Sequence, residues 1–494
     1  NLTLINDPLD MVTIDGAAQA DLLGKVIVHG IWRRQENEIA LSIKTLGTRL
    51  DAALLERVAC FCPSSLCGKL SGLRLEGQAQ VNVNVAFRPG AEAAWSLQAH
   101  CQVSKATVRH PALPMPLTNI EASLRFDGSD LRVESLRAEA GATVLTAQGV
   151  GRLPCPDQHF EGSLRVEHLE IDENLGAHLP EKLQPLMRLY QPRGRITVQV
   201  DVARRGGEWT APAPGQASRI TVQPEGISAC FERFPYPLHK VSGAVHYLLP
   251  QQRFHVDLTG HAQNHPVFIK GHWQGEHPHI DAHFEITTAS VAIDPIMIAA
   301  IPEPIRATVK SFHVQGKIGL KAEIRRRPAD DGFHADYHIH LRDGAILWDE
   351  FPILLTNVAG FIDIHQAIQN RNAEFGVRNE ETKAETGVSR AGPSAPDSGL
   401  RIPESASWQF RDLHGTRGDG LVAIFARSTD PDGRHDRPGV YVELTGKNLP
   451  LDADLHAALR TMPPLAKAWE TFQPSGRLNF TATIDRRGKQ PEDL

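Results

Sequence analysis

The 494-residue chain has little of several residue types that mark common protein classes. Aromatic residues make up 6%, and there are only 6 cysteines and 5 methionines. Lysine and arginine (52) are slightly outnumbered by aspartate and glutamate (58), giving a net charge of −6. The chain therefore lacks the basic field that nucleic-acid binding requires. It has no signal peptide and no run of 18 or more apolar residues, so we predict no transmembrane helix within it.

Motifs of catalysis are also missing. The sequence contains no G-x-S-x-G, no H-E-x-x-H and no P-loop, so we predict that the chain is not an enzyme and uses no cofactor. An aspartate that recurs four times could be a repeated catalytic carboxylate. Because each copy precedes a helix-like stretch, a helix N-cap is the favoured interpretation. The four copies are Asp51, Asp172, Asp294 and Asp452.

Cysteine and histidine each offer one candidate for a metal site. Cys60, Cys62 and Cys67 lie together in ACFCPSSLC, but a fourth zinc ligand at suitable spacing is not evident. Two of the three could pair in an oxidising compartment, although free thiols are favoured. His338 and His340 share one face of a predicted strand, the polar one, so a solvated outer face is favoured over a ligand pair. We predict no metal site.

A repeat with a period of about 121 residues is the strongest positive signal. Three landmark features recur with this period: the aspartate, a glycine, and a short segment that begins with proline and continues with apolar residues, which we call the Pro–apolar phrase. The phrase begins at Pro114, Pro235 and Pro352, and the glycine lies at Gly30, Gly149 and Gly271. Repeat units that stack on their neighbours form one extended body. The predicted units are a partial first repeat at 1–90, a second at 91–210, a third at 211–332 and a fourth at 333–494, with a disordered insertion at about 369–405.

Each unit is predicted to hold about six strands and one short, proline-broken helical segment. The strands alternate apolar and polar residues, as in QVNVNVAF, and such one-sided strands pair antiparallel. No second set of strands is visible to cover the apolar face. We therefore expect a mainly β fold: an elongated, twisted antiparallel sheet curled into an open hydrophobic groove. The predicted wall is Val81, Val83, Val85, Ile120, Ala122, Leu124, Phe126, Ile196, Val198, Val200, Val202, Val241, Val245, Ile318, Leu320, Ile324, Leu478, Phe480 and Ile484.

An apolar strip of that size needs a ligand, and long hydrocarbon chains match it best. The phrases LRVESLRAEAGATVLTAQGVGRL (131–153) and PYPLHKVSGAV resemble the AsmA-like family, which includes TamB-related proteins and shares its architecture with repeating-β-groove lipid-transfer proteins. The resemblance implies a groove that crosses the periplasm and carries phospholipid from the inner to the outer membrane, supporting outer-membrane biogenesis. It implies as partners phospholipid acyl chains and a membrane at each end.

The resemblance also implies a location in the periplasm with an N-terminal anchor in the inner membrane, which we expect to lie in a segment missing from this sequence. The chain begins with Asn1 inside a unit, so we expect it to be a piece of a longer protein. The alternative function is a β-repeat scaffold of the cell envelope that binds other proteins through its sheet edge. Lipid transport requires the apolar face of the strands to continue from one repeat unit to the next, whereas a scaffold would tolerate a polar or closed interior.

Overall fold

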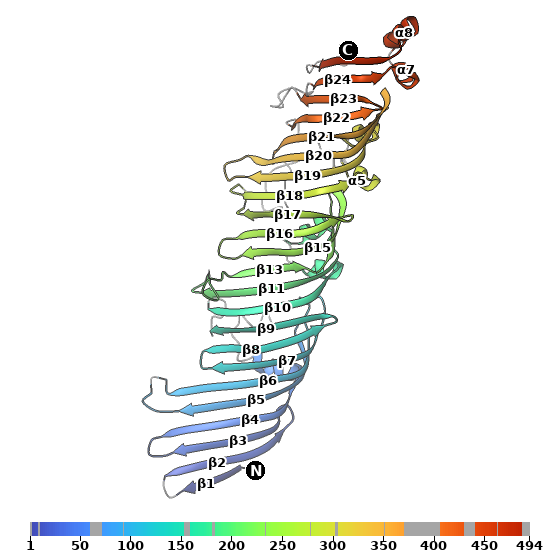
Figure 1. Cartoon of the computed structure of the whole chain (residues 1–494). Helices are drawn as coiled ribbons and strands as arrows, with labels where there is room; N and C mark the ends of the chain where they lie inside the picture. The colour runs from blue at the N-terminus through green and yellow to red at the C-terminus, as the bar shows by residue number, and fades with distance from the viewer. Residues whose placement is uncertain are drawn as a thin grey trace, which may run out of the picture. The chain divides into compact units, whose positions relative to one another are not determined.

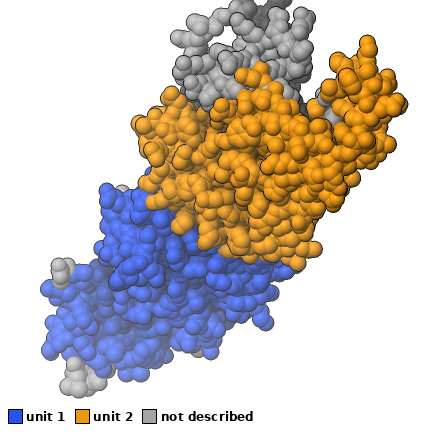
Figure 2. Space-filling view, turned by 45° about the horizontal axis from the view of Figure 1, so that its top comes forward, with its two compact units in different colours: residues 1–179, 194–225, 244–252 blue, residues 180–193, 226–243, 253–494 orange. Residues whose placement is uncertain are grey.

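The computed structural model shows a mainly β protein: one open antiparallel sheet of 25 strands with a few short helices (Figure 1). The chain divides into two compact units, coloured separately in Figure 2, and each is described by itself. Unit 1 comprises 1–179, 194–225 and 244–252, and unit 2 comprises 180–193, 226–243 and 253–494. The described residues are 2–7, 10–59, 72–91, 93–152, 159–179, 183–232, 234–276, 278–301, 305–349, 351–369, 406–428, 440–461 and 463–486.

Unit 1 holds the strands up to β13 and two short helices. Its elements are β1 (Leu2–Asp7), β2 (Met11–Ala20), β3 (Gly24–Arg33), β4 (Glu38–Leu50), α1 (Ala52–Ala59), β5 (Arg74–Phe87), β6 (Trp95–Arg109), β7 (Leu117–Asp127), β8 (Asp130–Ala140), β9 (Thr143–Arg152), β10 (Phe160–Ile171), α3 (Glu173–His178), β11 (Gly194–Arg205), β12 (Glu208–Thr210) and β13 (Arg219–Pro224). The end of β15 (Phe234–Leu248) also belongs to it.

Unit 2 holds the start of β15 and the later strands. Its elements are α4 (Gln184–Tyr190), β14 (Ile227–Phe231), β16 (Arg253–Ala262), β17 (His265–Gln274), β18 (Asp281–Ala292), α5 (Pro295–Ala300), α6 (Ile305–Ser311), β19 (Gln315–Arg326), β20 (Gly332–Trp348), β21 (Phe351–Gln369), β22 (Ala406–Arg417), β23 (Gly420–Ser428), β24 (Val440–Pro450), α7 (Ala453–Leu459), α8 (Pro463–Phe472) and β25 (Arg477–Arg486).

Most successive strands pair antiparallel in chain order, as the alternating sequence predicts. The exceptions are β12, which pairs with β11, and β14, which pairs with β15, so that β11, β13 and β15 follow one another directly. Among the described residues β1 pairs only with β2, and β25 only with β24. No early strand pairs with a late one, so the sheet is open. The open antiparallel sheet is thus confirmed, but the expected curling of the sheet into a groove is not found. Strand pairing follows from one-sided alternation, whereas alternation alone does not specify curling along a sheet.

The recurring aspartates cap helices. The Asp172 carboxylate accepts a hydrogen bond from the backbone N–H of Leu175 at 2.7 Å, and Asp294 accepts one from Met297 at 2.7 Å. Asp51 and Asp452 do the same for α1 and α7. Each satisfies a backbone donor that a helix start leaves without a partner. The N-cap interpretation is confirmed.

The Pro–apolar landmark marks a bend in the strands. Asn119 of β7, Lys240 of β15 and Asn357 of β21 occupy the same place in that phrase, and each has a φ of 51°. This left-handed backbone conformation is costly for residues other than glycine. In β7 and β21 the pairing register shifts around it. Such bulges bend a strand and increase its twist, so the repeated phrase encodes a repeated backbone feature.

The glycine landmark marks a close approach between strands. A Cβ at Gly271 of β17 would lie 2.3 Å from the carbonyl oxygen of His283 and 2.6 Å from the Phe284 ring. A Cβ at Gly30 of β3 would lie 2.4 Å from the Leu41 side chain. The absent side chain therefore leaves room for a larger residue on the neighbouring strand.

Helices cover one margin of the sheet's apolar face. In unit 2, Met297 and Ala300 of α5 are buried against Val267 and Val291, with Ile286 packed beside them. A second cluster in unit 1 centres on Ala106, Ile120 and Ala138, which are buried among residues of β4 to β9. These two parts of the buried core therefore lie near the bulges and helices, while a further buried cluster, Ile280, Ala282 and Phe333, lies at the starts of β18 and β20. The four repeat boundaries stay a prediction, and Cys60, Cys62, Cys67 and the residues 370–405 of the expected insertion lie outside the described residues.

Candidate functional site

Apolar side chains form unbroken rows across the strands of unit 1. Val83 of β5 lies directly opposite Ile43 of β4 and Ala99 of β6. Residues opposed in this way place their side chains on the same face of the sheet. One row reads Val28, Ile43, Val83, Ala99, Phe126 and Leu131 over β3 to β8. Another reads Leu136, Ala147, Leu164, Val200, Ile220 and Tyr247 over β8 to β15.

Unit 2 has the same arrangement on its own strands. Leu320 of β19 faces Ile339 of β20, which in turn faces Ile362 of β21. The whole row is Leu320, Ile339, Ile362, Phe410, Ala426, Val442 and Ile484, over β19 to β25. A parallel row is Leu258, Ile269, Ile286, Ala322, Tyr337, Ile364 and Trp408, over β16 to β22. Neither row contains a charged residue.

Most side chains predicted for the wall are half-buried. Three are buried (Ile120, Ala122 and Val241), and Leu478 is exposed. The side chain of Ile484 lies outside the described residues. The half-buried ones are Val81, Val83, Val85, Leu124, Phe126, Ile196, Val198, Val200, Val202, Val245, Ile318, Leu320, Ile324 and Phe480. Strand neighbours therefore flank these side chains while part of each still meets solvent. We call this half-buried face, bounded by the covered margin, the apolar wall.

The opposite face of unit 2 is polar and carries a network of ion pairs. Asp363 of β21 accepts hydrogen bonds from Arg411 of β22 and, at 2.7 Å, from His338 of β20. The hydrogen bonds from Arg411 hold the pKa of the Asp363 carboxyl below its usual range, and His338 adds to the effect. His338 and His340 thus lie on the outer polar face, as predicted. Sequence alone missed the partners, because cross-strand register decides which carboxylate meets which cation.

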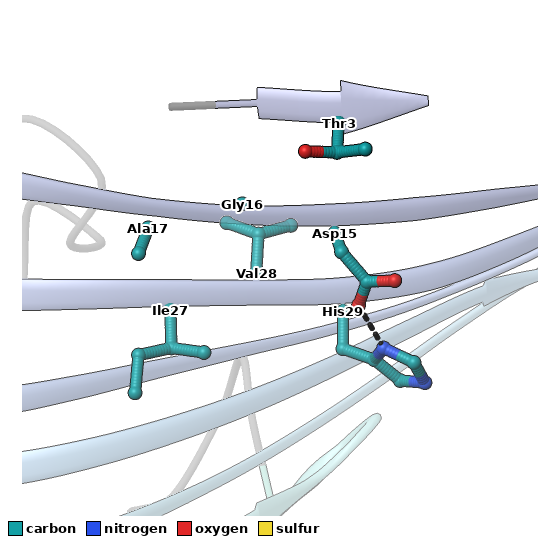
Figure 3. Close-up of a pocket in the computed structure, with 7 residues that line it drawn as sticks. All are labelled: Thr3, Asp15, Gly16, Ala17, Ile27, Val28 and His29. Carbon is teal, nitrogen blue, oxygen red and sulfur yellow. Dashed lines mark hydrogen bonds and ion pairs between the residues drawn. The ribbon is translucent and has the colours of Figure 1, made fainter. Parts of the chain in front are cut away.

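A shallow pocket lies over β1 to β3 (Figure 3). It has a volume of about 570 Å³. Its polar feature is the pair of His29 Nδ1 and Asp15 Oδ1, 2.5 Å apart, with the Thr3 hydroxyl near the neighbouring strand. Both paired side chains are well exposed, so this ion pair contributes little to stability. The paired side chains lie on the polar face of the strands, but the lining also includes Val28, which belongs to the first apolar row of unit 1.

No metal-binding group of three or more histidine, cysteine, aspartate or glutamate side chains occurs in the described ranges. Of the cysteines, Cys101 and Cys230 are described, and both are free thiols. Burial raises the pKa of the Cys101 thiol, which disfavours the reactive thiolate. The helices seen in the described ranges are all too short or too polar to cross a membrane.

No protein-family model, curated protein or solved structure matches this chain.

Proposed function

We propose that the chain is a non-enzymatic carrier of phospholipid that holds acyl chains against the apolar wall. The observation that supports this most strongly is the continuity of the rows. Within each unit, every step from one strand to the next meets another apolar side chain, from Val83 to Ala99 in unit 1 and from Leu320 to Ile339 in unit 2. A core buried inside a closed sandwich would not leave these side chains half in contact with solvent.

The energetics favour hydrocarbon as the occupant. Covering an apolar surface recovers about 0.8 kcal/mol for each buried CH₂ group. Neighbouring strands lie about 4.8 Å apart, so a lipid can pass from one row position to the next without crossing a charged side chain. Its head group stays in water at the margin of the wall. The apolar wall therefore allows movement along the sheet rather than tight binding at one point.

We further propose that this transport runs between the inner and outer membranes of a cell envelope, through the periplasm. The support is the resemblance to the AsmA-like family, carried by 131–153 and by the phrase around Pro235. The structure adds that the Pro235 phrase contains the left-handed Lys240, at the same place as Asn119 and Asn357. A scaffold that binds proteins through its sheet edge is the second candidate, and it makes no use of the wall.

A charge placed on the wall tests the proposal. Val198→Asp puts a carboxylate in the middle of the unit 1 wall, opposite Val166 and Val222. Gln199→Asp puts the same group one residue on, on the opposite face, and is the matched control. Transfer of fluorescent phospholipid between donor and acceptor vesicles is measured for each protein. We expect Val198→Asp to slow transfer at least about tenfold, because a carboxylate pressed against acyl chains has no partner. Gln199→Asp should transfer at the wild-type rate.

Leu320→Asp tests the wall of unit 2 in the same way. Circular dichroism and thermal unfolding verify that each variant retains its sheet. Folded Val198→Asp and Leu320→Asp proteins that transfer lipid as fast as the wild type would rule out the wall as the path. A wild-type protein that transfers no lipid but binds another protein through a sheet edge would favour the scaffold.

A further inference from the structure

A buried charged residue interrupts the apolar face of unit 2 at the hairpin end of β19. Arg326 is the last residue of β19, two positions beyond Ile324 and on the same face, directly opposite Ala282 of β18. Its side chain is among the most buried in the molecule, with only 2% of the residue exposed. It sits beside a cluster in which Ile280, Ala282 and Phe333 are buried.

The Arg326 guanidinium has few partners. It lies 5.6 Å from the centre of the Phe333 ring, and its Nη2 donates a long hydrogen bond of 3.3 Å to the Pro278 carbonyl oxygen. Its Nε and Nη1 have no hydrogen-bond partner. No carboxylate in the described part of the chain pairs with it. The preceding arginine, Arg325, points to the polar face and has Asp336 at 3.2 Å.

A buried cation with no counter-ion is costly. Arginine keeps its charge in proteins, and taking an unpaired charge out of water is strongly unfavourable. A cation–π contact of this kind offsets only a small part of that penalty. An ordered water would satisfy an N–H group but would not supply a negative charge. Among the described residues the guanidinium therefore has no anion, and its two unpaired N–H groups are the donors that an anion would use.

We propose that Arg326 binds the phosphate group of a phospholipid whose acyl chains lie on the apolar wall. This inference rests on the proposed function and adds a head-group site to it. Arg326 lies at the hairpin end of β19, and Leu320 and Ile324 follow on the same face toward the helix-covered margin. Six residues of strand span about 20 Å, the scale of an extended acyl chain. The phosphate replaces the Pro278 carbonyl oxygen as the hydrogen-bond acceptor. The guanidinium N–H groups then donate to the phosphate oxygens, whose spacing matches that of the donors.

The site has a distinct role in transport. The rows of the apolar wall contain no charged residue, so lipids slide along them, whereas a lipid that reaches β18 to β20 pauses with its phosphate on Arg326. The pause selects lipids that carry a phosphate over neutral diacylglycerol. The ligand chemistry is thus an anionic phosphate diester joined to hydrocarbon chains.

The test compares Arg326→Met with the wild type. Methionine fills similar space without a charge, and replacing an unpaired buried charge by an apolar residue is neutral or stabilising, so we expect the variant to fold. Binding of phosphatidylglycerol and of diacylglycerol from otherwise identical vesicles is measured for each protein. We expect the wild type to prefer phosphatidylglycerol at least about tenfold and Arg326→Met to lose that preference while binding diacylglycerol as before. Arg325→Met, on the polar face, is the matched control and should keep the preference.

Three results would overturn the inference or the proposed function separately. Equal preference in wild type and Arg326→Met, with both lipids bound, would refute the head-group site and leave lipid carriage standing. Thermal stabilisation of the wild type, but not of Arg326→Met, by inorganic phosphate, without any preference between the lipids, would refute the lipid assignment and indicate a free-anion site. A folded wild type that binds neither lipid would refute the proposed function itself.

Discussion

Asp363 of β21 and Arg411 of β22 form a two-point ion pair on the polar face of unit 2. Arg411 Nη2 lies 3.1 Å from Asp363 Oδ1, and Arg411 Nε donates to Oδ2. Asp363 is buried at 7% exposure, although the arginine beside it is well exposed. His338 of β20 donates to the same carboxylate. One aspartate thereby ties three neighbouring strands together.

This arrangement predicts an acid-sensitive contribution to stability. The folded-state pKa of Asp363 is lowered from 3.8, first by the hydrogen bonds from Arg411. A lowered pKa means that the unfolded chain binds the proton more readily, so the contribution is present above about pH 4 and is lost as pH falls through the folded pKa. Asp363→Asn should lower stability near neutral pH by about 1–3 kcal/mol. Its loss of stability from pH 5 downward should also be shallower than that of the wild type.

Thermal unfolding of both proteins from pH 7 to pH 2 measures the effect. The Asp485→Asn protein is the control, because Asp485 lies at the exposed last strand of the sheet. Parallel pH profiles for wild type and Asp363→Asn would show that the ion pair contributes nothing to folding.

Replacing a bulge residue of positive φ by glycine is expected to increase the stability of the protein. Lys240 has a φ of 51° and an exposed side chain. Lys240→Gly should therefore raise stability by about 0.5–1 kcal/mol, since glycine adopts this conformation without a Cβ clash. The same change at Lys270, an exposed residue in regular β17, should lower stability by about 0.5–1 kcal/mol. Thermal midpoints that shift in the same direction for both variants would contradict the left-handed bulge.

The glycine landmark predicts a steric penalty. Gly271→Ala forces a methyl group against the His283 carbonyl and the Phe284 ring, so we expect a loss of about 1–3 kcal/mol. Gly176→Ala in α3 meets nothing within 4 Å, and alanine favours a helix by up to about 1 kcal/mol. Chemical denaturation curves for the two variants should therefore move in opposite directions. An unchanged midpoint for Gly271→Ala would show that the strands relax around the methyl group at no cost.

Much of the fold follows from local pattern. The alternation of Val81, Val83 and Val85 specifies a one-sided strand, and the position of Asp172 before a helix-like stretch specifies a cap. Both are confirmed, because each depends on residues close in sequence. The repeated Pro–apolar phrase is visible in the sequence, but its structural role is not. A lysine gives no indication of a left-handed backbone, so the conformation of Lys240 could not be predicted from the sequence.

The limits of the sequence show most clearly at Arg326. The alternation of Ile318, Leu320 and Ile324 runs on to position 326, so the pattern places a cation on the apolar face. Whether that cation has a carboxylate partner depends on the loop that brings Pro278 over it and on the register of β18. The expected curling of the sheet is not found, because alternation along a strand specifies which face is apolar but not how far each strand twists against the next.

Lipid extraction and mass spectrometry on the folded, detergent-free protein test the central claim most directly. The apolar wall predicts several phospholipid molecules per chain in the wild type and in Gln199→Asp. It also predicts their loss in Val198→Asp and Leu320→Asp, whose carboxylates interrupt the rows. A folded wild-type protein that carries no lipid, or wall variants that carry as much as the wild type, would contradict the account.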